Sequence, residues 1–461
     1  MKNKGLAIVP CFGSKTHDFL FETVINKFNF DRSCYRNVRE EFSKNIFMRL
    51  SIFKVILLLI SNIRYLIKGD IRGIYYKQIQ IGSVINEEVI SCSKTATCDN
   101  IILIFKKTLK SIIIIDFYTP LFLAKKINLI LCGDEAYVFS GISAQMACMY
   151  NIPCYCIKGG YEVYASKYDC IWKTGFRRDD FNSKSILNIS ENILSESEKI
   201  LKRLCDNDKS SLHYMSVPDK KVKNSTNTDY SDLDIIIFAH DFFDAPGIRA
   251  GNIYVNHVKW IKETIDFLLS KKIKVGVRFH PNSRSKNNPI INKLKKQYNS
   301  KVVWVDGELS LKSLKGKIKG IVTVYGTVCL ESAYLGIPVV TAGITQWSLV
   351  NIAQESKSET EYKLNLASLA NGEVMLSEEG VLDLKNNAIR VFALNSLVRR
   401  ASNKTIYYPF DDIDKNLWGD IFHDKYPASI YQRRESFLNS NQAVKAVTNL
   451  VKEIDVTKIF K

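Results

Sequence analysis

The sequence has no uninterrupted apolar run of the length that a membrane-spanning helix requires. Its most apolar stretch, 49–68, is interrupted by Lys54 and Arg64, and its longest clean run is only Val55–Ile60. A spanning helix needs about 20 consecutive apolar residues, so this segment is too short to cross a bilayer. Residues 1–10 have too short an apolar core for a secretory signal peptide, and we expect them to form the first strand of a sheet.

Cysteine pairs and metal-binding motifs are also missing. The 11 cysteines are scattered, and the pair Cys154 and Cys156 has no second pair or nearby histidine that would complete a zinc site. We therefore expect buried, reduced thiols in a cytoplasmic protein. No Asp-x-Asp sequence stands in a loop that suits a metal site, and the one that ends at Asp234 lies within a predicted strand, so we expect no metal in the site and no cofactor besides the substrate.

The chain carries a strong excess of positive charge. Its 65 Lys and Arg residues against 47 Asp and Glu residues give a formal net charge of +18. Such an excess is typical of proteins that bind nucleic acids, anionic membranes or anionic substrates. No basic run alternates with aromatic residues as in known nucleic-acid modules, so we expect no nucleic-acid partner. An anionic membrane surface and phosphorylated or acidic sugars are the partners that remain.

The stretch Ile321–Thr341 has the most informative pattern in the chain. It predicts a buried strand, a tight turn at Gly326-Thr327, a helix and a second strand. A helix that begins directly after a strand directs its first backbone N–H groups at the sheet edge, which makes an anion site suited to a phosphate. Glu331, about one turn into this helix, can reach a sugar hydroxyl beside that phosphate. Many βαβ units share this pattern, however, so the segment alone leaves the site open.

A second group of candidate residues follows the predicted strand 272–277. Arg278, His280 and Pro281 come at its end, where ligands of open α/β folds bind. The fixed φ of Pro281 holds the turn extended, and the guanidinium of Arg278 matches the geometry of a phosphate. The alternative is a histidine at the sheet edge without a function.

Together the two segments resemble a known family. R-x-H-P, then a strand and G-T-x-x-x-E-x-x-x-x-G-x-P-V-V, is similar to the nucleotide-sugar half of GT-B glycosyltransferases. The resemblance is strongest to bacterial enzymes that build capsule and lipopolysaccharide from CMP-linked Kdo or sialic acid, and CDP-glycerol-type polyol-phosphate transferases are similar. It implies that the nucleotide and its phosphate lie between His280 and the turn Tyr325-Gly326-Thr327. Sialyltransferase-type enzymes have two hydroxyl residues in that turn, whereas this chain has only Thr327, so the base of the nucleotide stays open.

The resemblance also implies an architecture. We expect an α/β fold of two Rossmann-like domains that face a central cleft, with C-terminal helices bracing them, and the chain length suits two domains. The expected parts are an acceptor-side domain at 1–215, a polar linker at 216–232, a nucleotide-sugar domain at 233–400 and a helical segment at 401–461.

The first half of the chain shows the same order of elements as 321–341. The β-branched runs 101–105 and 111–115 favour strands, and a strand at 126–133, a helix at 139–150 and a strand at 151–157 follow them. Asp134 and Glu135 come directly after a strand. In similar enzymes a carboxylate of the acceptor domain removes the proton of the attacking hydroxyl, and these two residues are candidates for that base. Alternatively, Asp134 caps the next helix.

The loop after the strand 233–239 contains further candidates. His240 is a candidate for contact with a donor phosphate or for a second base, and Asp244 would orient its imidazole. An ordinary loop that caps the helix around Trp260 is an equally good interpretation. Asn256 and His257 fall near the same edge but are not selected.

The segment 49–77 allows two interpretations. Its apolar residues and flanking cations suit an amphipathic helix that lies on an anionic leaflet, and they also suit a buried helix with charged ends. The first interpretation fits a peripheral enzyme at the inner face of the bacterial cytoplasmic membrane.

The function that we predict is metal-independent transfer of a sugar, with CMP-linked sugars as candidates, from a nucleotide-activated donor to a surface-polysaccharide glycan or lipid-linked glycan. Three alternatives stay open: a polyol-phosphate transferase, a sugar-nucleotide epimerase of GT-B-like fold, and a non-catalytic glycan- or lipid-binding partner of a polysaccharide assembly complex.

Overall fold

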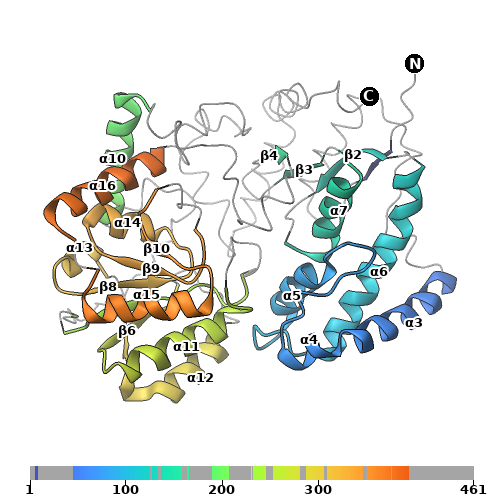
Figure 1. Cartoon of the computed structure of the whole chain (residues 1–461), viewed down its shortest axis with the longest axis horizontal. Helices are drawn as coiled ribbons and strands as arrows, with labels where there is room; N and C mark the ends of the chain where they lie inside the picture. The colour runs from blue at the N-terminus through green and yellow to red at the C-terminus, as the bar shows by residue number, and fades with distance from the viewer. Residues whose placement is uncertain are drawn as a thin grey trace, which may run out of the picture. The chain divides into compact units, whose positions relative to one another are not determined.

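The structure is a computed structural model in which the chain forms two compact units. Unit 1 comprises residues 1–93, 97–168 and 402–461, and unit 2 comprises residues 94–96 and 169–401. The structure describes residues 6–8, 45–124, 127–132, 136–152, 154–157, 163–165, 189–206, 230, 232–244, 253–280, 287–305, 309–345, 350–374 and 376–393. The two units are described separately (Figure 1).

Unit 2 is built on a parallel sheet of six strands in the order β10-β9-β8-β5-β6-β7. The strands are β5 (Ile235–Phe238), β6 (Val275–Arg278), β7 (Val303–Trp304), β8 (Gly320–Thr323), β9 (Val339–Thr341) and β10 (Gln354–Glu355). The central strands are continuous apolar runs buried on both faces, as expected where helices cover both sides of a parallel sheet. The predicted α/β class is therefore confirmed in this unit.

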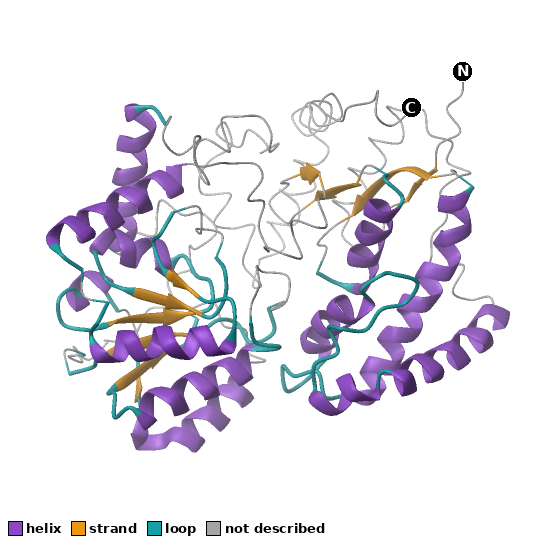
Figure 2. Ribbon diagram, viewed as in Figure 1, coloured by secondary structure: helices purple, strands orange, loops and turns teal. Residues whose placement is uncertain are grey.

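Helices cover both faces of this sheet (Figures 1 and 2). One face carries α10 (Glu191–Cys205), α13 (Leu311–Leu314), α14 (Val328–Leu335) and α16 (Glu378–Phe392), and the other carries α11 (His257–Ser270), α12 (Asn288–Tyr298), the 3-10 turn Asn299–Lys301 and α15 (Glu359–Asn371). Between α11 and α15, the buried Trp260 Nε1 donates to Tyr362 Oη at 2.9 Å. This satisfies an indole N–H that burial would otherwise leave unpaired.

Helix α10 lies in unit 2, whereas the predicted boundary at residue 215 placed it in the first domain. Its apolar stripe packs against α14 and α16, and Leu201 and Cys205 belong to the core that these helices share with the sheet. Its sequence shows an amphipathic helix with a polar side, but it does not show which core the apolar stripe packs against. Of the predicted linker 216–232, only Tyr230 and Asp232 belong to the described residues, and the predicted C-terminal segment 401–461 lies outside them.

Unit 1 contains a four-stranded sheet in the order β1-β2-β3-β4. β1 (Leu6–Ile8), β2 (Ile127–Cys132) and β3 (Cys154–Ile157) are parallel, and β4 (Val163–Ala165) runs antiparallel to β3. Its helices are α3 (Asn45–Ser61), α4 (Ile63–Lys68), α5 (Ile81–Cys92), α6 (Ile101–Leu123) and α7 (Val138–Met149). The predicted α/β class is confirmed here as well, while the cleft between the domains stays a prediction.

The prediction of strands at 101–105 and 111–115 is wrong, because one helix, α6, covers both. Asn100 begins this helix by accepting a hydrogen bond from the Leu103 amide at 3.1 Å. Its buried residues include Ile104, Thr108, Ser111, Ile112, Ile115, Tyr118 and Phe122. Their spacing of three to four residues forms one helix face, and packing of that face against α3, α5 and α7 overrides the β-propensity of isoleucine.

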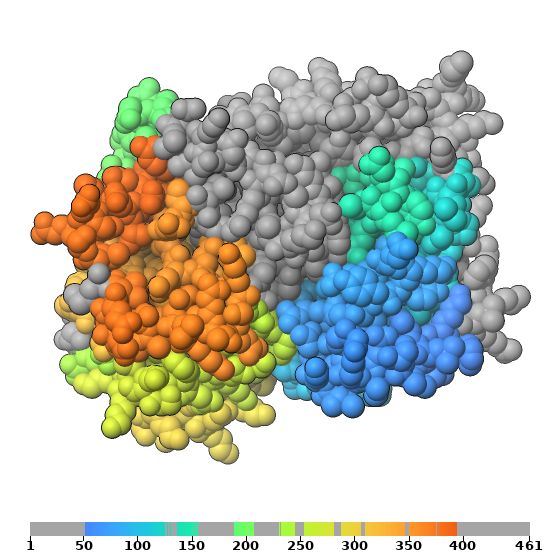
Figure 3. Space-filling view, viewed as in Figure 1, coloured from blue at the N-terminus to red at the C-terminus, as the bar shows by residue number. Residues whose placement is uncertain are grey.

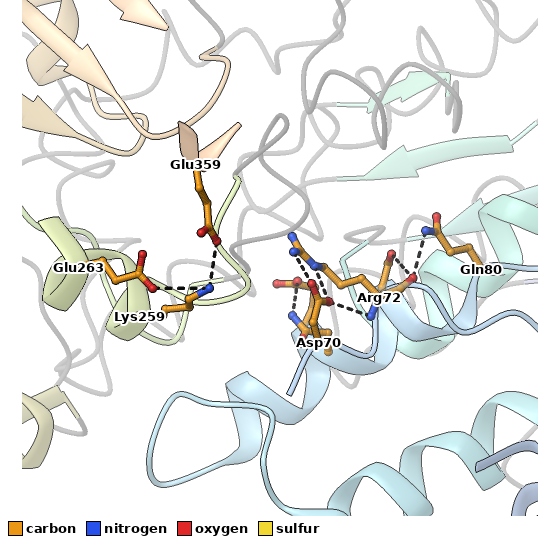
Figure 4. Close-up of polar contacts among 9 residues, drawn as sticks. Asp70, Arg72, Gln80, Lys259, Glu263 and Glu359 are labelled. Atoms are coloured by element: carbon orange, nitrogen blue, oxygen red, sulfur yellow. Dashed lines mark hydrogen bonds and ion pairs between the residues drawn. The ribbon is translucent and has the colours of Figure 1, made fainter. Parts of the chain in front are cut away.

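Surface ion pairs connect neighbouring segments within each unit (Figure 4). In unit 2, Lys259 of α11 contacts Glu359 of α15 at 3.0 Å and Glu263 at 3.6 Å. In unit 1, Arg72 contacts Asp70 at 2.7 Å, and its carbonyl accepts a hydrogen bond from the Gln80 side chain. Exposed pairs of this kind contribute little, about 0 to 1 kcal/mol each.

None of the helices in the described part of the chain is long and apolar enough to cross a membrane.

Candidate functional site

The carboxyl ends of three neighbouring strands define the candidate site. In the parallel register, Phe238 of β5 pairs with Arg278 of β6 on one side and with Thr323 of β8 on the other. Two residues beyond this row, the three strands lead to His240, His280 and Tyr325.

These three side chains lie side by side. The His240 ring centroid is 5.8 Å from that of His280 and 4.6 Å from that of Tyr325. Three residues that are far apart in sequence therefore form one group at the sheet edge. The sequence predicted all three as separate site residues, and the structure brings them together.

His240 has a carboxylate partner. Its Nε2 lies 3.0 Å from Asp244 Oδ2, as the sequence predicted, and both side chains are mostly buried. The loop between them is fixed by Asp241, which accepts hydrogen bonds from the Phe243 amide at 2.9 Å and from the Asn287 side chain at 3.1 Å. A carboxylate on one imidazole nitrogen fixes the orientation of the ring, so this pair suits proton transfer or phosphate contact.

His257 is a member of the group that was not selected from the sequence. It is fully buried at the first position of α11, with its ring 5.2 Å from that of His240. Its Nε2 lies 3.3 Å from Tyr325 Oη, which ties the two residues together. The neighbouring Asn256 caps the helix by accepting from the Lys259 amide at 2.7 Å. An Asn-His pair before an amphipathic helix was the available signal, because a capping Asn puts the next residue at the helix start.

Helix α14 begins beside this group. Its N-cap residue, Thr327, has helical backbone angles (φ −59°, ψ −20°) and makes no side-chain capping bond to the helix. A Cβ added at Gly326 would lie 3.2 Å from Val328 Cγ1, so the turn leaves little room for a side chain. The first amides of a helix have no acceptor within it and attract anions, as the sequence pattern predicted for this turn.

Arg278 and Glu331 add two ionisable side chains near the same edge. The Arg278 guanidinium lies 5.6 Å from the Phe238 ring centroid, and its Nη1 donates to the Leu309 carbonyl at 3.3 Å. Burial raises the pKa of Glu331 to about 7, although the charge of Arg278 acts in the opposite direction. A carboxyl group that exchanges its proton near neutral pH can both donate to and accept from a ligand hydroxyl.

Three predicted site residues, Asp134, Glu135 and Pro281, lie outside the described residues. The helix after Glu135, α7, begins at Val138 with Tyr137 as its N-cap residue, which corrects the alternative in which Asp134 caps it. The carboxylate at its start belongs to Glu88 of α5, whose Oε2 accepts a hydrogen bond from the Val138 amide at 2.9 Å.

Among the described cysteines, Cys98, Cys154, Cys205 and Cys329 are buried, whereas Cys92 and Cys148 are exposed. Burial raises the pKa of Cys205 and of Cys329 to about 12, so both stay protonated at neutral pH. Across the described ranges, no three His, Cys, Asp or Glu side chains are grouped so that they could hold a metal ion.

No protein-family model matches the chain, and no curated protein matches its sequence. Among solved structures, it is similar to the KpsC beta Kdo 2,4 transferase of Thermosulfurimonas dismutans (13% identity, TM-score 0.32, 53% of this chain and 79% of that one). It is also similar to UDP-GlcNAc 2-epimerases of Methanocaldococcus jannaschii (13%, 0.27, 63% and 81%) and Rickettsia bellii (12%, 0.27, 89% and 99%). Likenesses this distant carry no argument about function, which has to come from the geometry of the site.

Proposed function

We propose that unit 2 binds the phosphate of a nucleotide-activated sugar at this sheet edge and that the protein transfers the sugar to a glycan. The observation that carries the proposal is the convergence of His240, His280 and Tyr325 from equivalent positions of three adjacent parallel strands. The edge also holds the start of α14 and Arg278, so it combines backbone amides, imidazoles and a guanidinium. That set of donors suits a phosphate that gains negative charge as a leaving group.

In the proposed reaction, an acceptor hydroxyl attacks the anomeric carbon of the sugar and the bond from that carbon to the phosphate oxygen breaks. The start of α14 at Gly326-Thr327, together with Arg278 and His280, stabilises the negative charge that remains on the phosphate, so the reaction requires no metal. Protonated Glu331 donates to a hydroxyl of the donor and later accepts from it. The proton of the acceptor passes to Asp134 or Glu135, or to His240 held by Asp244.

The donor and acceptor classes rest on the motif resemblance. R-x-H-P and G-T-x-x-x-E resemble capsule and lipopolysaccharide enzymes, and we propose a CMP-linked or other nucleotide sugar as the donor. The acceptor is a bacterial surface-polysaccharide glycan, free or linked to lipid, at the inner face of the cytoplasmic membrane. The net charge of +18 favours such anionic substrates.

The proposal is tested by thermal stabilisation with CMP, CDP, UDP, GDP and TDP, each with magnesium and with a chelator. A ligand at 100 times its dissociation constant adds about 2.7 kcal/mol to the stability, which raises the melting temperature measurably. We expect stabilisation by one of these nucleotides that is equal with and without magnesium. The absence of stabilisation by any of them would refute the proposed donor.

Two variants locate the binding. His280→Ala and Arg278→Ala should each remove most of the stabilisation, because each removes a phosphate donor at the sheet edge. Lys385→Ala is the matched control for lost positive charge, since Lys385 of α16 is paired with Glu198 at 2.6 Å within the same unit. Equal losses in all three variants would assign the effect to overall charge and not to the site.

A sugar-nucleotide epimerase is the second candidate function, and the His240–Asp244 pair is the observation that favours it. An epimerase needs a proton-transferring group close to the donor sugar itself, and this pair lies at the donor edge. Incubation of the protein with a nucleotide sugar in the absence of an acceptor separates the two functions. Proton NMR would show a new epimer for an epimerase, whereas a transferase leaves the donor largely intact until a glycan is added.

A further inference from the structure

Helices α3 and α4 of unit 1 expose a continuous apolar face. Seven large side chains on them are exposed: Ile52, Phe53, Ile56, Leu57, Ile60, Ile63 and Ile67. Phe53 is 63% exposed, Ile60 64% and Ile67 80%. One face of α3 carries positions 53, 56, 57 and 60, because spacings of three, four and seven residues return to the same side of a helix. The segment is at the surface in the space-filling view (blue in Figure 3).

The opposite side of α3 fixes the helix in this orientation. Ser51, Val55 and Leu59 are buried, and α3 packs against α6. Lys54 forms an ion pair with Asp116 of α6, and Lys77 pairs with the same carboxylate at 2.6 Å. Because these contacts hold the helix from one side, it cannot roll to bury its second apolar face within unit 1. An apolar face that stays exposed beside a buried one calls for a partner outside the unit.

The charges beside the face indicate which partner fits. Arg64 and Lys68 of α4 are exposed, and segment 45–69 contains no Asp or Glu. A second copy of the chain would meet these cations with the same cations. Anionic lipid headgroups would neutralise them, while the apolar side chains enter the boundary between headgroups and acyl chains.

We propose that the exposed face of α3 and α4 docks unit 1 on the surface of an anionic lipid bilayer. The helix lies in the plane of the interface, because its other side is occupied by α6. This decides between the two interpretations of segment 49–77: one side of the helix belongs to the core, and the other side meets the membrane. The inference is independent of the nucleotide that unit 2 binds.

The test is co-sedimentation of the purified full chain with two kinds of vesicle, one of phosphatidylcholine alone and one of an equimolar mixture with phosphatidylglycerol. We expect binding to the mixed vesicles that weakens as salt is added. The double variant F53S/I60S should bind them at least about tenfold more weakly, because two large side chains no longer enter the interface. Leu364→Ser, at a side chain of α15 that is 65% exposed, is the matched control and should bind as the unchanged chain does.

A second variant tests the charges. R64Q/K68Q should lower the affinity for the mixed vesicles by about fivefold per residue and remove most of the preference for them over phosphatidylcholine. Both side chains are exposed, and unchanged circular dichroism and melting temperature will show that each variant is folded.

Three results would overturn the proposal. The first is that the unchanged chain binds neither vesicle, and the second is that F53S/I60S and Leu364→Ser reduce binding equally. The third is a dimer in size-exclusion chromatography that F53S/I60S dissociates without any vesicle binding, which would assign the face to a second copy of the chain.

Discussion

Two strand–helix–strand segments, one in each unit, end in the same way and begin differently. The segment β2–α7–β3 and the segment β8–α14–β9 both join adjacent parallel strands. After each helix comes a residue with positive φ, Asn151 at 56° beyond the C-cap residue of α7 or Gly336 at 76° at the C-cap of α14, and Ile-Pro follows it. The hydrogen bonds agree as well, since the amides of Ile152 and Ile337 both donate at 2.8 Å to a carbonyl five residues earlier.

The starts of the two helices differ in what meets the backbone amides. At α7, the protein's own carboxylate, Glu88, accepts the hydrogen bond of the Val138 amide. At α14, the turn Gly326-Thr327 lies beside Tyr325 and the histidines of the sheet edge. The same sequence pattern therefore gives a helix start that is capped by a side chain of the protein in one unit and a candidate anion site in the other. An acidic side chain from elsewhere in the fold makes the difference.

The largest expected effect comes from giving α14 a carboxylate of its own. Thr327→Asp keeps a good N-cap residue, so the helix stays folded, but it places a negative charge where we propose the phosphate binds. Repulsion between like charges of several kcal/mol should lower nucleotide affinity by about a thousandfold in calorimetric titration. Thr327→Ser is the control, and it should bind normally. Unchanged nucleotide affinity in Thr327→Asp would place the phosphate elsewhere.

The reverse change removes the Glu88 carboxylate of α5 that accepts a hydrogen bond at the start of α7. Glu88 contacts Lys107 at 2.5 Å, Lys110 at 3.3 Å and the Val138 amide, and its side chain is mostly buried. Glu88→Ala should therefore lower the free energy of unfolding by about 3 kcal/mol in chemical denaturation. Glu88→Gln, which keeps an acceptor for the amide, should lose less. Equal losses in the two variants would show that the charge is unimportant.

This prediction includes a pH dependence. Burial acts to raise the pKa of Glu88, but Lys110, Lys107 and the Val138 amide together hold the pKa below its usual value of 4.5. A carboxyl group with a lowered pKa stabilises the fold above the unfolded value, and this stabilisation is lost as the pH falls through the folded value. The unchanged chain should thus lose stability below pH 4.5 more steeply than Glu88→Ala.

Glu331 should show the opposite pH dependence. Its pKa is raised from 4.5 to about 7 by burial, so the folded chain holds a proton that the unfolded chain has released, and stability falls as the pH rises through this range. The difference corresponds to at most about 3 kcal/mol, and partial contact with solvent reduces it to about 2. Glu331→Gln should consequently raise the melting temperature at about pH 8 and leave it nearly unchanged at about pH 4. Equal effects at both pH values would contradict the raised pKa.

The smallest effects concern the matching helix ends. A Cβ at Gly336 would lie 2.5 Å from Val381 Cγ1, so Gly336→Asn should cost about 1 to 2 kcal/mol even though asparagine tolerates positive φ. The exchange at the other end, Asn151→Gly, should change stability by less than about 0.5 kcal/mol. Denaturant unfolding of both variants checks the pair. A larger loss in Asn151→Gly than in Gly336→Asn would mean that the two ends are held by different contacts.

Much of the candidate site could be predicted from local sequence because it lies where strands end. Polar residues directly after apolar runs, such as His280 and Tyr325, must emerge at a sheet edge, and parallel strands bring such edges together. His257 was missed because local sequence does not show that the first residue of α11 packs against His240 and Tyr325. Whether Asp134 or Glu135 takes part stays a prediction.

Two errors in the fold have the same physical origin. The isoleucine-rich runs of α6 have high β-propensity, yet the helix forms because one of its faces is covered by α3, α5 and α7. Helix α10 was placed in the wrong unit because its sequence shows an amphipathic helix but not the surface that covers its apolar stripe. In both cases the local sequence did not show which helices would cover the apolar face, and that packing decided the outcome.

The sequence by itself determined the α/β class, the glycine turn before α14, and the polar residues at the ends of β5, β6 and β8. These features depend on backbone preferences and on the alternation of apolar and polar residues over roughly ten positions. Only the tertiary structure decided that Glu88, 50 residues before Val138 in the chain, occupies the start of α7, and that α3 keeps an apolar face exposed. Both outcomes depend on which distant side chains packing brings together, and no local preference encodes that.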